Sequence, residues 1–168
     1  MTKLRITLAL QLLFFVGWGG YLLYSRDSGS GDFYLETVPV DPRDLISGTY
    51  VALNYDVSRP SLGGCPALNE PGPIYVNLQP SGRTIKLESG ETEVYGAFDC
   101  SENPPKEPGW VKADLQQVFG GKRAVYGIEK FFLNEKDPRK DARSGSVAAK
   151  VRIGRNGKLQ LLDLIKKL

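Results

Sequence analysis

The first apolar segment is an uninterrupted run of nineteen uncharged residues at positions 6–24. A helix of that length rises about 1.5 Å per residue and measures roughly 28 Å, close to the ~30 Å hydrocarbon core of a bilayer. Trp18, Tyr21 and Tyr24 gather towards its end, where amphipathic rings favour the membrane interface. The pattern predicts one N-terminal transmembrane helix, with the lipid bilayer as its partner.

Two basic residues, Lys3 and Arg5, precede this segment. By the positive-inside rule they place the N-terminus in the cytoplasm and the rest of the chain across the membrane. A cleaved signal peptide shares these features, but the apolar run is long for one and no small-x-small cleavage site follows it. We expect an uncleaved single-pass anchor in the cell inner membrane. The domain beyond it would be periplasmic, or lumenal in a thylakoid.

Beyond the anchor the pattern changes to short apolar runs with a period of two. In residues 49–57, Val51, Leu53, Tyr55 and Val57 fall on one face of an extended strand, with the even-numbered positions on the other. The same signal predicts strands at 74–78, 84–88, 93–98, 110–118, 123–133, 147–153 and 158–164.

Glycine and proline punctuate these runs and predict how they connect. Turns are expected at 80–82, 89–90 and 120–121, and the Asn156-Gly157 pair is a strong hairpin signal. A proline-rich loop is expected at 103–109, and the charged stretch 134–143 is the one place that suits a short helix. The predicted fold is all-β: a small β-sandwich or barrel of about eight or nine short strands.

Length and charge refine this organisation. A chain of 168 residues has room for an anchor (1–24), a flexible Ser/Gly tether (25–31) and one β-rich domain (32–168). Without Lys3 and Arg5 the chain carries 20 basic and 19 acidic residues. This balance, with no basic stripe, argues against a nucleic-acid partner.

The two cysteines, Cys65 and Cys100, are too far apart for a CxxC redox or zinc pattern. An even number in an exported domain permits a disulfide between them. Two separately buried thiols are the alternative.

The chain has few side-chain types that could support catalysis or metal binding. The chain has no histidine, which removes imidazole bases, Ser-His-Asp triads and the usual zinc sites. No nucleotide-binding or EF-hand motif is present, and we expect no catalytic residues, metal or cofactor.

Asp41 and Asp44 could bind a cation or act as an acid–base pair, but a turn with Arg43 as their partner is favoured. Glu129, predicted to lie mid-strand, could mark a site, although a buried salt bridge to Arg123 or Lys150 is favoured.

The segment 41–57, DPRDLISGTYVALNYDV, resembles the family named for its motif GDYXXLXY. Gly48, Tyr50, Leu53 and Tyr55 match the motif, whereas Thr49 stands where the motif has aspartate. The segment YGIEKFFLNE at 126–135 is similar to a second recurring block of that family. The resemblance implies a membrane-anchored companion of multi-spanning membrane proteins and implies no particular reaction.

The motif itself favours a structural role. Gly48 lets the chain turn into the strand, Thr49 can cap that turn through its hydroxyl, and Leu53 and Tyr55 belong to the core face. Tyr50 projects to the opposite face.

The sequence therefore favours a non-catalytic accessory subunit of a larger membrane assembly, with a polytopic membrane protein as partner. Tyr50 and Trp110 are the hypothetical contact residues. One alternative is a small-ligand-binding module in which Glu129 or Asp44 orients the ligand. The second alternative is a hydrolase that resembles the Ser/Lys signal peptidases. Its nucleophile would be Ser25, Ser28 or Ser30, and its base would be Lys122. The methionine that normally follows the nucleophile in that family is missing after each of these serines.

Overall fold

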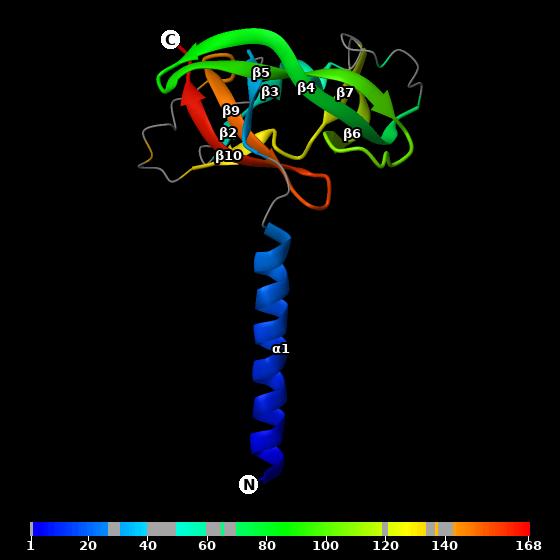
Figure 1. The fold of residues 1–168 in the computed structure, drawn as a ribbon, viewed down its shortest axis with the longest axis vertical. Helices are drawn as coiled ribbons and strands as arrows, with labels where there is room; N and C mark the ends of the chain where they lie inside the picture. Colours follow the sequence, from blue (N-terminus) through cyan, green and yellow to red (C-terminus); the bar gives the residue numbers. More distant parts are fainter. Residues whose placement is uncertain are drawn as a thin grey trace.

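The computed structural model describes residues 2–26, 31–39, 50–59, 65, 70–118, 121–133, 137 and 143–168. Helix α1 (Thr2–Arg26) projects from a β-rich domain (Figure 1). Within α1, residues Arg5–Tyr24 form a span that is long and apolar enough to cross a membrane. It is the one such span among the described residues. Ser25 and Arg26, predicted as tether, continue the helix, and residues 27–30 lie outside the described part.

The domain is built almost entirely of strands, which confirms the all-β prediction. Ten strands occur where eight or nine were expected, and they form a curled half-barrel (Figure 1). Their bounds are β1 (Phe33–Val38), β2 (Tyr50–Ala52), β3 (Asn54–Tyr55), β4 (Gly72–Leu87), β5 (Gly90–Ser101), β6 (Trp110–Val118), β7 (Gly121–Val125), β8 (Lys130–Phe132), β9 (Val147–Ile153) and β10 (Leu159–Lys166).

The main sheet has the order β10-β9-β1-β5-β4-β6-β7, and β3 pairs with β1 beside this path. Strand β1, which the sequence analysis did not single out, lies between β9 and β5 and runs parallel to β5. Strands β2 and β8 form a separate two-stranded sheet. We call this pair the aromatic ribbon, because Tyr50 and Phe132 face each other across it.

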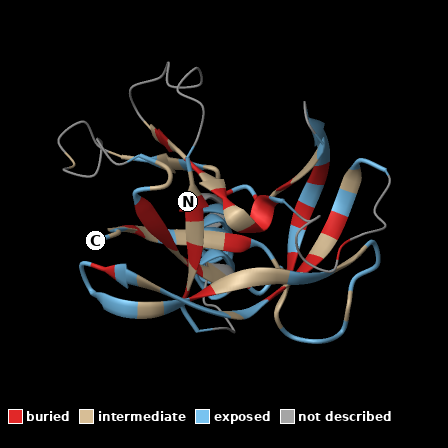
Figure 2. Ribbon diagram, turned by 90° about the horizontal axis from the view of Figure 1, so that it is seen from above, coloured by how far each residue is buried: buried red, intermediate tan, exposed pale blue. Residues whose placement is uncertain are grey.

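The hydrophobic core follows the predicted alternation. Buried positions alternate with more exposed ones along the strands (Figure 2). Val51, Leu53, Tyr55 and Val57 are all buried, as their period predicted. They do not belong to one strand, however, because β2 pairs with β8, β3 pairs with β1, and a 3-10 turn follows at Asp56–Ser58.

The turn predicted at 80–82 is wrong. Strand β4 continues through it, and the pairing with β5 shifts register between Pro80 and Thr84. The additional residues form a bulge, and their polar groups form hydrogen bonds with β5. The Ser81 hydroxyl donates to the Val94 carbonyl at 2.7 Å, and the Gly82 N–H donates to the Glu93 carboxylate at 3.0 Å. Gly82 takes a positive φ of 72°, so the glycine serves a bulge in place of a reversal.

The predicted strand at 123–133 is also divided. Strand β7 ends at Val125, Gly127 turns the chain with φ of 81°, and β8 begins at Lys130. Glu129 therefore lies in a connection and not mid-strand, which corrects the sequence prediction. The hairpins at 89–90 and at Asn156 and Gly157 form as predicted.

Cys65 and Cys100 are joined in a disulfide, with their Cα atoms 5.0 Å apart. The bond fastens residue 65 to the end of β5. The predicted helix at 134–143 lies outside the described residues except for positions 137 and 143.

Candidate functional site

Two buried tyrosines connect the motif segment to the segment 126–135. The Tyr55 hydroxyl donates to the Ile128 carbonyl at 2.6 Å. In return, the Tyr126 hydroxyl donates to the Val57 carbonyl at 2.7 Å. Each segment thus satisfies a backbone carbonyl of the other, and we call Tyr55 and Tyr126 the tyrosine pair.

Glu129 completes this junction. Its backbone carbonyl accepts a hydrogen bond from the Leu53 N–H at 2.8 Å. Its half-buried carboxylate accepts one from the Tyr126 N–H at 2.6 Å. The predicted salt bridge to Lys150 does not form, because Lys150 pairs with Asp32 at 2.9 Å; no ion pair with Arg123 occurs among the described residues. Glu129 holds the connection between β7 and β8 against the motif.

The electrostatics of the tyrosine pair favour a structural role. Burial raises the pKa of Tyr55 and of Tyr126, and the negative charge of Glu129 raises both further. Both phenols therefore stay protonated and act as hydrogen-bond donors. Neither is suited to act as a nucleophile or a base at neutral pH.

The aromatic ribbon presents the remaining motif tyrosine. Tyr50 lies opposite Phe132, with ring centroids 5.7 Å apart, and the Lys130 ammonium lies 4.7 Å from the centre of the Tyr50 ring. Phe132 is 70% exposed. Sequence reasoning missed Phe132, although in the pair Phe131-Phe132 a strand can bury only one ring; Phe131 packs on the core.

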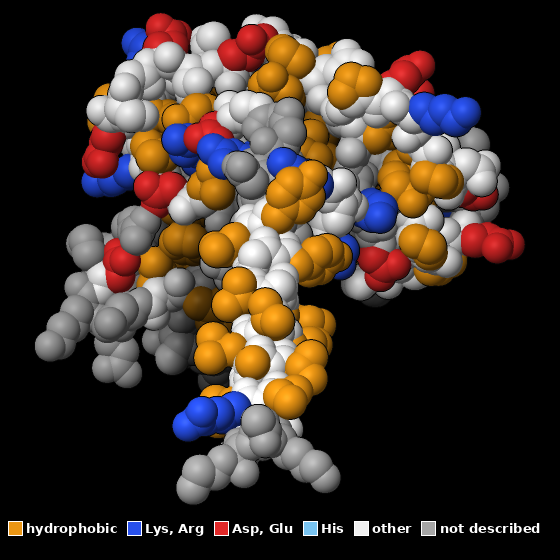
Figure 3. Space-filling model, turned by 60° about the horizontal axis from the view of Figure 1, so that its bottom comes forward, with side chains coloured by type: hydrophobic (Ala, Val, Ile, Leu, Met, Phe, Trp, Pro, Cys, Tyr) orange, Lys and Arg blue, Asp and Glu red, His pale blue; other side chains and the backbone are white. Residues whose placement is uncertain are grey.

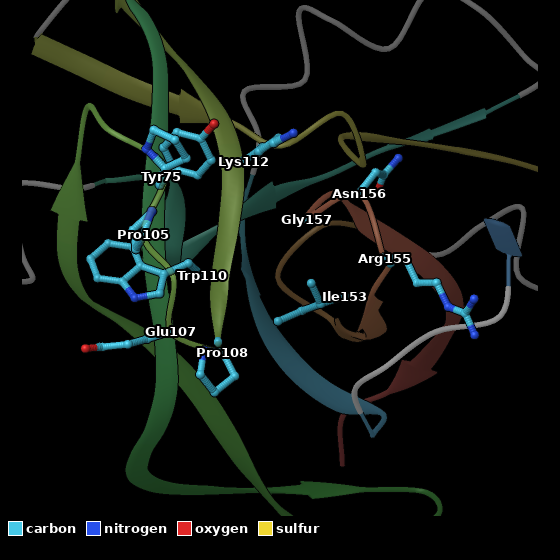
Figure 4. A pocket seen from close by; sticks show the side chains of 13 residues that line it. Tyr75, Pro105, Glu107, Pro108, Trp110, Lys112, Ile153, Arg155, Asn156 and Gly157 are labelled. Carbon is cyan, nitrogen blue, oxygen red and sulfur yellow. The ribbon is translucent and has the colours of Figure 1, made fainter.

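Trp110, the other predicted contact residue, lies in a different place. It begins β6 and lines an open groove of about 470 Å³ between the proline-rich loop and the β9–β10 hairpin (Figure 4). Its indole Nε1 is buried and has no hydrogen-bond partner among the described residues. The groove is lined by Tyr75, Pro104, Pro105, Glu107, Pro108, Gly109, Trp110, Lys112, Ile153, Gly154, Arg155, Asn156 and Gly157.

Backbone hydrogen bonds fix the walls of this groove. The Lys112 N–H donates to the Gly157 carbonyl at 2.7 Å and holds the hairpin against β6. The Leu78 N–H donates to the Gly109 carbonyl at 3.0 Å and holds the end of the proline-rich loop against β4. The groove is therefore a built feature of the sheet.

The groove also lies near the end of α1. The Arg155 guanidinium carbon is 3.8 Å from the centre of the Tyr24 ring, and Figure 1 shows the β9–β10 turn beside the upper end of the helix. Tyr24 is the last residue of the candidate membrane span.

The structure does not bring all the predicted residues together. Tyr50 belongs to the aromatic ribbon and Trp110 to the groove, so they form two surfaces. Asp41, Asp44, Gly48 and Thr49 lie outside the described residues, as do Ser28, Ser30 and the Ser25 side chain. Lys122, the alternative base, lies in β7.

Comparison with known proteins gives one match. The family model described as GDYXXLXY protein matches residues 12–164, nearly the whole chain. Neither the curated proteins nor the solved structures contain a match.

Proposed function

We propose a function from one premise: the chain belongs to the GDYXXLXY protein family. The protein is a non-catalytic accessory subunit, anchored in the inner membrane by α1. Its β domain lies on the far side of that membrane and contacts a polytopic membrane protein through the aromatic ribbon.

The anchor is supported by the helix itself. Residues 6–24 carry no charge, and the candidate span Arg5–Tyr24 is not buried inside the protein. Figure 3 shows hydrophobic side chains along the face of the helix turned to the viewer. The basic residues Lys3 and Arg5 orient the N-terminus towards the cytoplasm. The Cys65–Cys100 disulfide suits an oxidising compartment on the other side.

The observation that carries the partner proposal is the exposure of Phe132 beside Tyr50. A phenyl ring 70% open to solvent costs solubility, and aromatic side chains are enriched where proteins bind one another. Both rings stand on a short sheet that is separate from the main one. A partner can therefore cover them without disturbing the core.

The chemistry of the junction supports a non-catalytic role. The tyrosine pair and Glu129, the groups that the family segments bring together, are all engaged in hydrogen bonds within the fold. The chain also has no histidine to activate a nucleophile.

Site-specific photo-crosslinking tests the proposal. A benzophenone amino acid at position 132 of the full-length protein, irradiated in native membranes, should give one discrete adduct with a polytopic protein. The control position is Phe98, an exposed aromatic residue on β5. Equal adducts from both positions, or none from position 132, would reject the ribbon as the contact surface.

A further inference from the structure

The groove beside Trp110 lies where lipid headgroups lie if α1 crosses the membrane. Tyr24 ends the span, and the Arg155 guanidinium carbon lies over its ring, 3.8 Å from the ring centre. The β9–β10 turn is thus held at the level of the interface, and the groove opens next to it. We infer that this groove binds the phosphate headgroup of an anionic phospholipid. The inference rests on the anchoring part of the proposed function and is independent of the ribbon.

The charges of the groove suit an anion. Lys112 and Arg155 line it, both are exposed, and neither forms an ion pair with a described carboxylate. The nearby cations on β9 are different, because Asp32 neutralises Lys150 at 2.9 Å and Arg152 at 2.6 Å. Basic side chains gather on the underside of the domain around the base of the helix (Figure 3). Lys112 and Arg155 are therefore available for a phosphate.

The geometry of Arg155 leaves its donors available. Its guanidinium carbon lies over the Tyr24 ring, 3.8 Å from the ring centre. Its N–H groups form no hydrogen bond with a described residue, and guanidinium N–H groups match the oxygens of a phosphate. Tyr24 therefore positions Arg155 at the interface without consuming its hydrogen-bonding capacity.

The remaining lining suits the neutral part of a headgroup. Tyr75, Pro105 and Trp110 provide apolar rings on one side of the groove, with the hairpin on the other (Figure 4). The Trp110 Nε1–H is buried without a hydrogen-bond partner among the described residues, so the indole contributes apolar surface to this wall. The one carboxylate in the lining, Glu107, points away from the hairpin in Figure 4. It therefore does not face the cations across the groove.

The test uses the full-length protein in neutral detergent, with Trp18→Phe so that Trp110 alone reports by fluorescence. The probes are dioctanoyl phosphatidylglycerol, dioctanoyl phosphatidylcholine and inorganic phosphate. We expect a saturable response to phosphatidylglycerol only. Each basic side chain near an anionic lipid contributes about fivefold to binding, so Lys112→Gln with Arg155→Gln should weaken it roughly 25-fold.

The matched control is Lys86→Gln with Lys166→Gln. It removes the same charge from two exposed residues on β4 and β10, and it should bind like the parent protein. Circular dichroism checks that both double variants are folded. Equal responses to the two lipids, or equal binding by the two double variants, would overturn the inference. Saturation by inorganic phosphate at similar concentrations would also overturn it, because the site would then take a free anion. Alkaline carbonate extraction of native membranes tests anchoring separately.

Discussion

The Tyr55 hydroxyl donates a hydrogen bond of 2.6 Å to the backbone carbonyl of Ile128, 73 positions further along the chain. The Tyr126 hydroxyl returns the contact to Val57. The last tyrosine of the family motif is therefore a fold-determining residue, which joins the start of the domain to the β7–β8 connection. This connection leads into β8, so the tyrosine pair also helps to place the aromatic ribbon.

Removing either hydroxyl should destabilise the domain. Tyr55→Phe and Tyr126→Phe each leave a buried carbonyl without its donor, at a cost of about 1–2 kcal/mol in the free energy of unfolding. Urea unfolding of the full-length protein in detergent, followed by circular dichroism, measures this cost. The control is Tyr95→Phe, whose hydroxyl has no hydrogen bond with a described residue. Equal stability of all three variants would show that the two hydrogen bonds contribute nothing.

The same tyrosines predict a sensitivity to alkali. Their pKa values are raised in the folded state above the ordinary value of 10.0. Their contribution to stability is complete below pH 10 and declines at higher pH, because the unfolded phenols ionise and the folded ones do not. Above pH 10 the fall in the free energy of unfolding should approach about 1.4 kcal/mol per pH unit for each tyrosine. Urea titrations between pH 9 and 11 measure the slope, and the Tyr55→Phe, Tyr126→Phe double variant should flatten it. An unchanged slope would argue against both pKa shifts.

Substitution of Glu129 separates the contribution of its hydrogen bond to stability from that of its charge. Glu129→Gln keeps an oxygen that can accept from the Tyr126 N–H, whereas Glu129→Ala leaves that donor unpaired. We expect Glu129→Ala to lose about 1–2 kcal/mol of stability and Glu129→Gln clearly less. Thermal unfolding of both variants provides the comparison. Equal losses would mean that the charge of Glu129, and not its hydrogen bond, matters to the fold.

The disulfide should account for a large part of the stability. Cys65 and Cys100 are separated by 35 positions, and closing a loop of that size is worth about 4 kcal/mol by the chain-entropy relation. Cys65→Ser with Cys100→Ser should therefore melt well below the parent protein. Maleimide labelling of unfolded protein from native membranes, with and without reductant, reports whether the bond is present in the cell. Labelling without reductant would place the cysteines in a reducing environment.

Local periodicity was enough to predict the core. The alternation at Val51, Leu53, Tyr55 and Val57 identified buried positions correctly, although the strand is divided. The hairpin at Asn156 and Gly157 was also predictable, because an Asn-Gly pair fits the turn that joins two antiparallel strands.

Non-local pairing explains what could not be predicted. Pro80 and Gly82 have the composition of a turn, and only the side chains that satisfy the bulge across β4 and β5 reveal that the strand continues. The parallel contact of β1 with β5 leaves no local signal that names the partner strand. The groove likewise depends on the packing of a loop and a hairpin against the sheet, so sequence singled out Trp110 but not Lys112 or Arg155.

Stoichiometric co-purification tests whether the aromatic ribbon holds a polytopic membrane protein. Tagged full-length protein is purified from native membranes in mild detergent and compared with the Tyr50→Ala, Phe132→Ala double variant and with a Phe98→Ala control. We expect a polytopic membrane protein in near-equal amount with the parent and the control, and its loss from the double variant at an unchanged melting temperature. Recovery of the parent protein alone, or equal recovery of a partner with the double variant, would contradict the assignment of the aromatic ribbon as the contact surface of an accessory subunit.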